Sequence, residues 1–548
     1  MKRRFNCLFA FMLMATLFLS LAGCKQEPVL TDFTQSDVEI DGSTIGNNWA
    51  FITYSLSAYK NQSVTISFSA DMRVENNGTK DERLMWQVNI NSYPVIAEHT
   101  FKPGTTDYVT VSGKGEDIQL GADNAIYLST YQTDAANLKI SLKNVKYTIE
   151  GKPGQIVEEK GPYWCDESVA SFKDTYSKYF DSVGFAVTGD ELKNAEIQKG
   201  LKKHANTTTM GNEFKPDFVF NWALNQNVQT KDFTASNGKT IKVPASIPAF
   251  KSQDQYLNIC KTLGIKMRGH VLVWHSQTPQ AFFRENYNPS GSLVDKDTMT
   301  ARQEWYIKTV LEHVADWEKA NNNGEHIIWA WDVVNEAVAD GQGGALRNQG
   351  SDWYSIYKND EFIVNAFRFA NKYAPKDVLL CYNDYNCCTD SGKRSGMLTI
   401  LDHVIKARND STLPTRIDVM GMQSHITKYT TTAEFEQAVK DFTAKGLDVH
   451  VTELDIGTEE KYDSAELANA YGNMFKTFIK NRKTDSAHGI SSITIWGIND
   501  ETTWLNSASQ IVWHGNVTQY PLLFAKNASG QFVCKEAFDA VIEAATAK

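Results

Sequence analysis

The chain has 548 residues, of which 42% are hydrophobic and 11% aromatic, and its formal net charge is −10. This length exceeds one ordinary domain and allows a large domain beside a smaller one. The acidic balance argues against a nucleic-acid partner, because an electrostatic grip on phosphates needs a basic surface.

The N-terminus predicts a signal for export. Three basic residues at 2–4 precede an apolar run over residues 5–21, which is typical of a secretory signal peptide. The Leu-Ala-Gly-Cys ending resembles a bacterial lipobox, in which Cys24 becomes the lipidated first residue; an ordinary cleaved signal is the alternative. We therefore expect residues 1–23 to be a lipoprotein signal. Acyl chains would then anchor the exported protein to a bacterial membrane, at the cell surface or on the periplasmic face.

A tether, a β-rich segment and a linker follow. Residues 24–30 suit a short tether. Residues 31–150 contain several short runs with alternating apolar and polar residues, separated by Gly, Asn and Asp, which predicts a small all-β sandwich. Residues 151–164 are rich in Gly, Pro and charge and predict a linker.

From residue 165 to residue 548, short apolar runs alternate with amphipathic segments such as 301–320 and 360–373. Apolar strands alternating with helices favour an α/β fold with parallel strands. Eight units predict a (β/α)8 TIM barrel, with a doubly wound sheet as the alternative. The candidate strands are residues 182–187, 206–212, 265–274, 326–336, 377–384, 418–425, 448–455 and 491–500.

Polar or indole side chains end nearly all of these runs, at the edge where barrel enzymes carry their active sites. Glu336 ends the fourth run and Glu453 the seventh, so the two carboxylates should lie nearly opposite each other in the ring. Such a pair suits glycoside hydrolysis, in which one carboxyl protonates the leaving sugar and the other attacks or positions water.

The region from about 168 to 545 resembles glycoside hydrolase family 10, the endo-β-1,4-xylanases of a (β/α)8 clan. The fragments that carry the resemblance, in the family's order, are NEFKPD (212–217), RGHVLVWHSQTP (268–279), WDVVNEAV (331–338), NDYN (383–386), GMQSH (421–425), VTELD (451–455) and IWGINDETTW (495–504). The resemblance implies a retaining enzyme that cleaves internal bonds of xylan and xylo-oligosaccharides without a metal or organic cofactor.

The resemblance also implies residue roles. Glu336 matches the family's general acid/base and Glu453 its nucleophile, so one must carry a proton while the other stays ionised. His425 matches a histidine that hydrogen-bonds the nucleophile, and Asn335 matches a contact to the sugar 2-hydroxyl. The remaining matched sugar contacts are Asn212, Lys215, His270, Trp274, Tyr385, Gln423, Trp496 and Trp504.

Two positions depart from the family's pattern. Gly211 stands where the family usually has Glu before its Asn, and Ala525 follows Pro-Leu-Leu-Phe where an acidic residue is usual. The missing carboxylate at 211 would weaken a glycone subsite or make room for a decorated sugar. The change at 525 concerns packing or solvation.

Residues 31–150 resemble, more weakly, the jelly-roll carbohydrate-binding modules often attached to xylanases; a structural spacer is the alternative. The aromatic residues that could serve such a module are Trp49, Trp86, Tyr93, Tyr127 and Tyr131. For the barrel, the alternatives are a related β-1,4-glycanase acting on glucan and a non-catalytic glycan-binding protein. We expect a monomer and, because the cysteines lack metal-binding spacings, no metal site.

Overall fold

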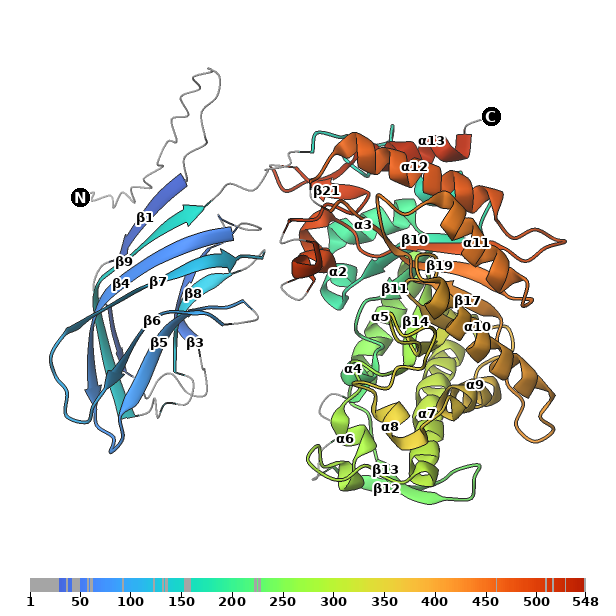
Figure 1. Ribbon diagram of the computed structural model, residues 1–548, viewed down its shortest axis with the longest axis horizontal. Helices are drawn as coiled ribbons and strands as arrows, with labels where there is room; N and C mark the ends of the chain where they lie inside the picture. The colour runs from blue at the N-terminus through green and yellow to red at the C-terminus, as the bar shows by residue number, and fades with distance from the viewer. Residues whose placement is uncertain are drawn as a thin grey trace, which may run out of the picture. The chain divides into compact units, whose positions relative to one another are not determined.

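The computed structural model describes residues 29–546 apart from 36–37, 42–49, 57–58, 60–62, 91–92, 122–123, 131–132, 134–136, 152–158, 221–223, 225–227, 460, 508–509, 515–516 and 528. The chain divides into two units, residues 1–156 and residues 157–548 (Figure 1). The predicted signal and Cys24 lie outside the described residues. None of the helices described has the length and apolar character that crossing a bilayer requires.

The first unit is a sandwich of two antiparallel sheets, as predicted. One sheet contains β1 (Val29–Gln35), β2 (Val38–Asp41), β4 (Ser63–Asn76), β7 (Val109–Gln119) and β9 (Leu138–Gly151). The other contains β3 (Ala50–Ser55), β5 (Glu82–Val88), β6 (Val95–Phe101) and β8 (Ala125–Ser129). Every second side chain of β4 is buried, because successive residues of a strand face opposite sides of the sheet.

Two of the five aromatic residues considered for sugar binding belong to the interior of the sandwich. Trp86 is fully buried, with its ring 4.5 Å from that of Phe68. Tyr127 is also buried, and its hydroxyl lies 3.1 Å from Oε1 of Gln87. Tyr93 is 45% exposed. Trp49 and Tyr131 lie outside the described residues.

The second unit is a closed barrel of eight parallel strands, which confirms the predicted (β/α)8 fold. Each strand pairs with the next along the chain, and the last pairs with the first. The strands are β10 (Ser182–Val187), β11 (Thr207–Met210), β14 (Lys266–Trp274), β15 (Ile328–Asn335), β16 (Leu379–Asp384), β17 (Val419–Met422), β19 (Asp448–Gly457) and β20 (Ile490–Ile495).

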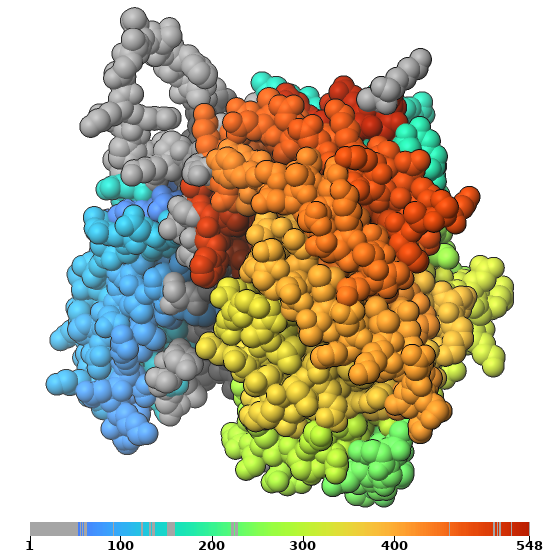
Figure 2. Space-filling view, turned by 45° about the vertical axis from the view of Figure 1, so that its right-hand side comes forward, coloured from blue at the N-terminus to red at the C-terminus, as the bar shows by residue number. Residues whose placement is uncertain are grey.

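Helices surround the strands (Figure 1). They are α1 (Phe172–Tyr176), α2 (Gly189–Lys193), α3 (Ala195–His204), α4 (Pro216–Phe220), α5 (Phe250–Leu263), α6 (Gln280–Phe283), α7 (Lys296–Asn321), α8 (Asp352–Tyr357), α9 (Glu361–Tyr373), α10 (Ser391–Lys406), α11 (Thr432–Thr443), α12 (Ser464–Lys480) and α13 (Glu536–Thr546). In α9, residues such as Phe362, Ala366 and Phe369 recur at helical spacing and are buried. Figure 2 shows α9 to α12, from yellow to orange, side by side on one face.

Short strands and 3-10 turns complete the second unit. The strands are β12 (Thr230–Thr234), β13 (Thr240–Pro244), β18 (His425–Thr427), β21 (Phe524–Lys526) and β22 (Phe532–Cys534), and the 3-10 turns are Glu285–Tyr287, Ala407–Asn409, Asp500–Thr502, Trp504–Asn506 and Ile511–His514. Ala525 lies in β21, where it is buried opposite Val533. Of the two expectations for the change at residue 525, packing therefore applies and solvation does not.

Several predicted strands are shorter in the structure. The run 206–212 is a strand only over 207–210. The run 418–425 is divided because Ser424 has a φ of 64°, which ends β17 before β18 begins. The run 491–500 ends at Ile495, since Gly497 has a φ of 136°. Left-handed backbone of this kind cannot continue a strand.

The predicted linker 151–164 is shorter at both ends. Gly151 pairs with Val29 as the last residue of β9. Trp164 is fully buried, with its ring 4.7 Å from Phe532 and 5.2 Å from Phe524. The barrel unit therefore includes residues that the sequence alone assigned to the linker.

Candidate active site

A cleft of about 1070 Å³ opens where the barrel strands end. It lies at the carboxyl edge, because residues that end or follow β10, β11, β14, β15, β16, β17 and β20 all line it. Every site residue predicted from the sequence for the barrel is in this lining. These residues are Asn212, Lys215, His270, Trp274, Asn335, Glu336, Tyr385, Gln423, His425, Glu453, Trp496 and Trp504.

Glu336 lies directly after β15, on left-handed backbone with a φ of 54°. Its backbone N–H donates to the carbonyl of Asn383 at 2.9 Å. Its Oε1 accepts from Gln423 Nε2 at 2.9 Å, and its Oε2 accepts from the indole N–H of Trp274 at 3.0 Å. Donors on both oxygens fix the carboxyl group in the cleft. Trp274, predicted only as a sugar contact, thus also holds this side chain.

Glu453, in the middle of β19, is 5% exposed. Its Oε1 accepts from Asn383 Nδ2 at 2.8 Å, and its Oε2 lies 3.3 Å from His425 Nε2. Burial acts to raise the pKa of Glu453, but the hydrogen bond from His425 and the nearby histidine charges outweigh it and hold the pKa below its usual range. Glu453 is therefore ionised at neutral pH, as a nucleophile must be.

His425 connects Glu453 to a second carboxylate. Its Nδ1 lies 2.9 Å from Oδ2 of Asp455, which also accepts from the indole N–H of Trp504 at 2.7 Å. Burial opposes the charged imidazole, but Asp455 and Glu453 outweigh it and raise the pKa of His425 to about 10. As an imidazolium, His425 carries an N–H on each ring nitrogen, and each of these groups faces a carboxylate.

We expect the His425→Gln substitution to cost less stability as the pH rises. The folded pKa of about 10 lies above the unfolded value of about 6.5. The imidazolium therefore stabilises the fold fully below the unfolded value, and this stabilisation is lost as the pH rises towards the folded one. Free energies of unfolding of the parent and variant, measured across this window, should converge. A constant difference between them would contradict the charge assignment.

Three amide side chains join the two glutamates. Asn383 Nδ2 donates both to Glu453 and to Asn335 Oδ1, at 2.8 Å each. Gln423 Nε2 donates to Asn335 Oδ1 at 3.1 Å as well as to Glu336. Thr452 fixes the Asn383 amide by donating to its Oδ1 at 2.7 Å. One continuous network therefore sets both carboxyl groups.

Asn383 was not among the predicted site residues, although it is the second-last residue of the predicted fifth strand and the first residue of the fragment NDYN. Its position directly before Asp384 and Tyr385 was a usable signal, because residues at the carboxyl ends of barrel strands face the site. It is fully buried and acts through its neighbours rather than by lining the cleft.

On one wall of the cleft, Lys215 Nζ lies 3.2 Å from Oδ1 of Asn212 and 2.9 Å from Oε1 of Gln277. It is also 5.0 Å from the centre of the Trp274 ring. Burial lowers the pKa of Lys215, while Glu453 and Glu336 act to raise it. An amine held between two amides beside an indole is suited to donating hydrogen bonds to sugar hydroxyls.

Behind this wall, His270 is held by an acidic partner from the next strand. Its Nδ1 lies 2.9 Å from Oδ2 of Asp332, whose Oδ1 accepts from Arg268 at 2.6 Å. All three side chains are buried. A hydrogen bond through Nδ1 leaves Nε2 of His270 for the cleft.

Aromatic rings enclose the reacting centre. The Trp496 ring lies 5.6 Å from His270 and 6.2 Å from His425, both edge-on, and Trp504 lies 4.7 Å from His425. Such rings can stack against the apolar faces of sugars. Among the described residues, no group of three or more His, Cys, Asp or Glu side chains is placed to hold a metal ion.

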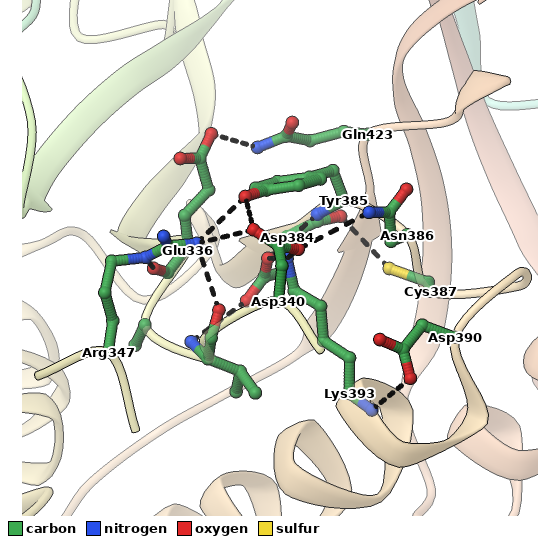
Figure 3. A network of polar contacts seen from close by, with 12 residues as sticks. Glu336, Asp340, Arg347, Asp384, Tyr385, Asn386, Cys387, Asp390, Lys393 and Gln423 are labelled. Atoms are coloured by element: carbon green, nitrogen blue, oxygen red, sulfur yellow. Dashed lines mark hydrogen bonds and ion pairs between the residues drawn. The ribbon is translucent and has the colours of Figure 1, made fainter. Parts of the chain in front are cut away.

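The remaining predicted residue, Tyr385, belongs to a polar network behind Glu336 (Figure 3). Its hydroxyl donates to Asp340 and accepts from Arg347 Nη2 at 2.9 Å. The ammonium of Lys393 lies 3.2 Å from the centre of its ring. Tyr385 is thus fixed from three sides while its ring lines the cleft.

A family model for glycosyl hydrolase family 10 matches residues 171–544, which contain the whole cleft. The chain belongs to glycosyl hydrolase family 10. The GH10 region is the barrel unit, so the family match and the fold divide the chain in the same way.

Named relatives support this GH10 assignment. The chain is 35% identical over 378 residues to endo-1,4-beta-xylanase B of Butyrivibrio fibrisolvens, covering 68% of this chain and 53% of that protein. It is 34% identical over 498 residues to endo-1,4-beta-xylanase Y of Acetivibrio thermocellus, covering 87% of this chain and 41% of that protein. The chain therefore spans about half the length of these relatives, or less.

A solved structure resembles both units of the chain. It comprises the CBM22-1 and GH10 modules of Clostridium thermocellum endo-1,4-beta-D-xylanase 10B, complexed with xylohexaose. The identity is 27%, the TM-score is 0.56, and the match covers 94% of each chain. In that protein, as in this one, a module precedes the GH10 barrel.

Proposed function

We propose that the protein is an endo-acting, retaining β-1,4-xylanase. The observation that carries the proposal is the pair Glu336 and Glu453, which line one cleft and share one amide network. The named relatives are endo-1,4-beta-xylanases, and the similar solved structure holds xylohexaose. A cleft on the barrel's surface, rather than an enclosed pocket, suits attack within a polymer.

The first step forms a covalent intermediate. The Glu453 carboxylate attacks the anomeric carbon while the bond from that carbon to the glycosidic oxygen breaks. Glu336, protonated, gives its proton to the departing oxygen, so the aglycone leaves as an alcohol. Asn335 is placed to hydrogen-bond the sugar 2-hydroxyl, because it lies between the two glutamates.

The second step releases the sugar. Glu336, now a carboxylate, takes a proton from water as the water oxygen attacks the same anomeric carbon. The bond to Glu453 breaks and the nucleophile is regenerated. Two inversions at one carbon give net retention, and Glu336 ends protonated for the next cycle.

Hydrolysis assays separate this proposal from its alternatives. Xylan should be cleaved to xylo-oligosaccharides of several lengths from the earliest times, as expected for an endo-acting enzyme. Faster hydrolysis of a mixed-linkage glucan would favour the related β-1,4-glycanase. Binding of xylan without the release of reducing ends would favour a non-catalytic glycan-binding protein.

We further propose that the sandwich is a carbohydrate-binding module. The support is its two-sheet fold and the CBM22-1 module in the similar solved structure. Trp86 and Tyr127 are excluded as platforms, because both are buried. Of the five aromatic residues considered, Tyr93, 45% exposed in the loop between β5 and β6, is the candidate ring that remains among the described residues. Retardation in gels containing xylan, compared with Tyr93→Ala, tests this.

Export and lipid anchoring through Cys24 are also proposed, on the sequence of residues 1–24 alone. Incorporation of labelled palmitate into the full chain, but not into the Cys24→Ala variant, would support acylation at this position. Equal labelling of both chains would rule it out.

The Gly211→Glu substitution should raise kcat/KM on short unbranched xylo-oligosaccharides by about tenfold. Gly211 lines the cleft, and a Cβ there would have only the carbonyl of Val187 within 4 Å, at 3.6 Å. A carboxylate can therefore enter the cleft and accept a hydrogen bond from a sugar hydroxyl, worth about 1.5–3 kcal/mol.

Gly211→Ala is the matched control, since it adds a side chain without a carboxylate. Arabinose-substituted oligosaccharides should gain less from Gly211→Glu than unbranched ones, because the new side chain occupies open space. Equal gains on both substrates would contradict the idea that Gly211 leaves room for decoration.

A further inference from the structure

Glu336 differs from Glu453 in how its backbone is held. It occupies left-handed backbone, a conformation that is uncommon for residues other than glycine and needs support from its surroundings. Its N–H is satisfied by Asn383, and its carbonyl accepts from Arg347 Nε at 3.1 Å. Figure 3 shows the carboxyl group directed towards Gln423, with Arg347 at the backbone end of the residue.

Arg347 fixes more than one point of the segment that follows Glu336. Its Nη2 donates to the carbonyl of Val338 at 3.1 Å, and its own backbone N–H donates to the carbonyl of Ala337 at 2.8 Å. The backbone N–H of Ala339 donates to the carbonyl of Ala345. Residues 337–339 and 345–347 thus form a small hairpin that returns the guanidinium to Glu336.

A second set of contacts holds the same segment from the β16 side. The hydroxyl of Tyr382 accepts from the backbone N–H of Ala337 at 3.2 Å and donates to Asp384 at 2.7 Å. Lys393, with no exposed side-chain surface, lies 2.8 Å from Asp340 and 3.2 Å from Asp384. Burial raises the pKa of Asp384 to about 6; Lys393 opposes this rise, and the charge of Glu336 adds to it.

We propose that Arg347 is a positioning residue for the acid/base, holding the Glu336 backbone so that the carboxyl is aimed at the departing glycosidic oxygen. The inference rests on the proposed function. It goes beyond the proposed function because Arg347 is absent from the lining of the cleft and therefore acts through the groups that it contacts, among them the carbonyls of Glu336 and Val338 and the hydroxyl of Tyr385. Both carboxyl oxygens of Glu336 accept hydrogen bonds from other donors. Arg347 therefore fixes the backbone from which the Glu336 side chain extends, and not the charge of its carboxyl group.

The chemistry of the guanidinium explains why lysine cannot replace it. Arg347 donates from Nε and Nη2 to two backbone carbonyls, a phenol and the carboxylate of Asp340 at once. An ammonium is a single point at the end of a flexible chain and does not reproduce this planar fork. The Arg347→Lys substitution therefore keeps the positive charge and removes the positioning contacts.

Two aryl β-xylobiosides test this inference. Phenoxide is a poor leaving group and needs the proton from Glu336, whereas 2,4-dinitrophenolate departs without one. Arg347→Lys should lower kcat/KM on the phenyl substrate by about tenfold or more, within the range of general acid catalysis, and change kcat/KM on the dinitrophenyl substrate by less than about twofold. Because kcat/KM reports steps up to the first bond cleavage, release of the intermediate does not enter.

Arg416→Lys is the matched control. Arg416 also donates to two backbone carbonyls, of Val378 and Pro375, and pairs with Asp418, but at the opposite end of the barrel strands. It should leave the ratio of the two rates unchanged. The ratio is taken within one preparation, so a partly unfolded variant still gives a valid result.

Arg347→Met, which removes the charge as well, should change the ratio at least as much as Arg347→Lys. Equal losses on both substrates would overturn the inference, since Arg347 would then support the site as a whole. No loss on either would also overturn it. Failure of the parent to hydrolyse either xylobioside would instead refute the proposed function.

Discussion

The Glu453→Ala variant should lose at least about 10⁴-fold in kcat on xylan, because the group that bonds the anomeric carbon is gone. Binding of xylo-oligosaccharides should survive, since the cleft walls built by Lys215, His270 and Trp496 are untouched. Initial rates of reducing-end release and calorimetric titration with xylohexaose measure the two effects separately.

Azide tests whether the Glu453→Ala variant has lost its nucleophile. In the alanine variant, azide can enter the space of the missing carboxylate and attack from the same side, giving a glycosyl azide of inverted configuration. Glu436→Ala is a suitable control, because Glu436 is paired with Lys480 on the helical exterior of the barrel. Turnover of xylan by the Glu453→Ala variant at the parent's rate would refute its assignment as nucleophile.

The Glu336→Ala variant should lose about 10²–10⁴-fold on xylan, the usual contribution of a general acid or base. Its loss should be far smaller on 2,4-dinitrophenyl β-xylobioside in the first step, because that aglycone needs no proton. The covalent intermediate on Glu453 should then accumulate, since no base activates the water. A burst of dinitrophenolate followed by a slow steady rate is the measurement.

Azide again discriminates, with the opposite stereochemical result. It needs no base, attacks the intermediate on Glu453 and gives a glycosyl azide of retained configuration. A retained product from Glu336→Ala together with an inverted product from Glu453→Ala fixes both roles. The reverse pattern would exchange them, and inverted products from both variants would exclude the double displacement.

The barrel and its site could be predicted because the ends of the strands can be recognised in the sequence. Apolar runs locate the strands, and the residue after each run reaches the carboxyl edge whatever the loop does next. Glu336, Glu453 and Gln423 could be found in this way, as could Trp274 at the end of its run, whereas His270 lies inside the same run and was found through the family resemblance. Even α7, predicted over 301–320, had a readable start: Asp295 caps it by accepting from the backbone N–H of Thr298.

Residues that act through others could not be found in this way. Arg347 lies in a loop without periodicity, and its importance follows from four side-chain contacts that only folding creates. The division of the sixth strand at Ser424 was equally hidden, because left-handed backbone is expected of glycine rather than serine. In the sandwich, by contrast, Trp86 stands two residues from Leu84 and two from Val88, so the three share one face of β5, a period-2 pattern that indicates an interior position.

The burial of Trp164 determines where the barrel unit can be cut. The segment that carries it runs along β22, with Trp164 N–H donating to the carbonyl of Phe532 and Cys534 N–H to that of Pro162. The indole of Trp164 thus packs the first segment of the barrel unit against the last one. A truncated chain beginning at residue 165 would lose this packing and expose Phe524 and Phe532, so a self-sufficient fragment must start upstream of Pro162.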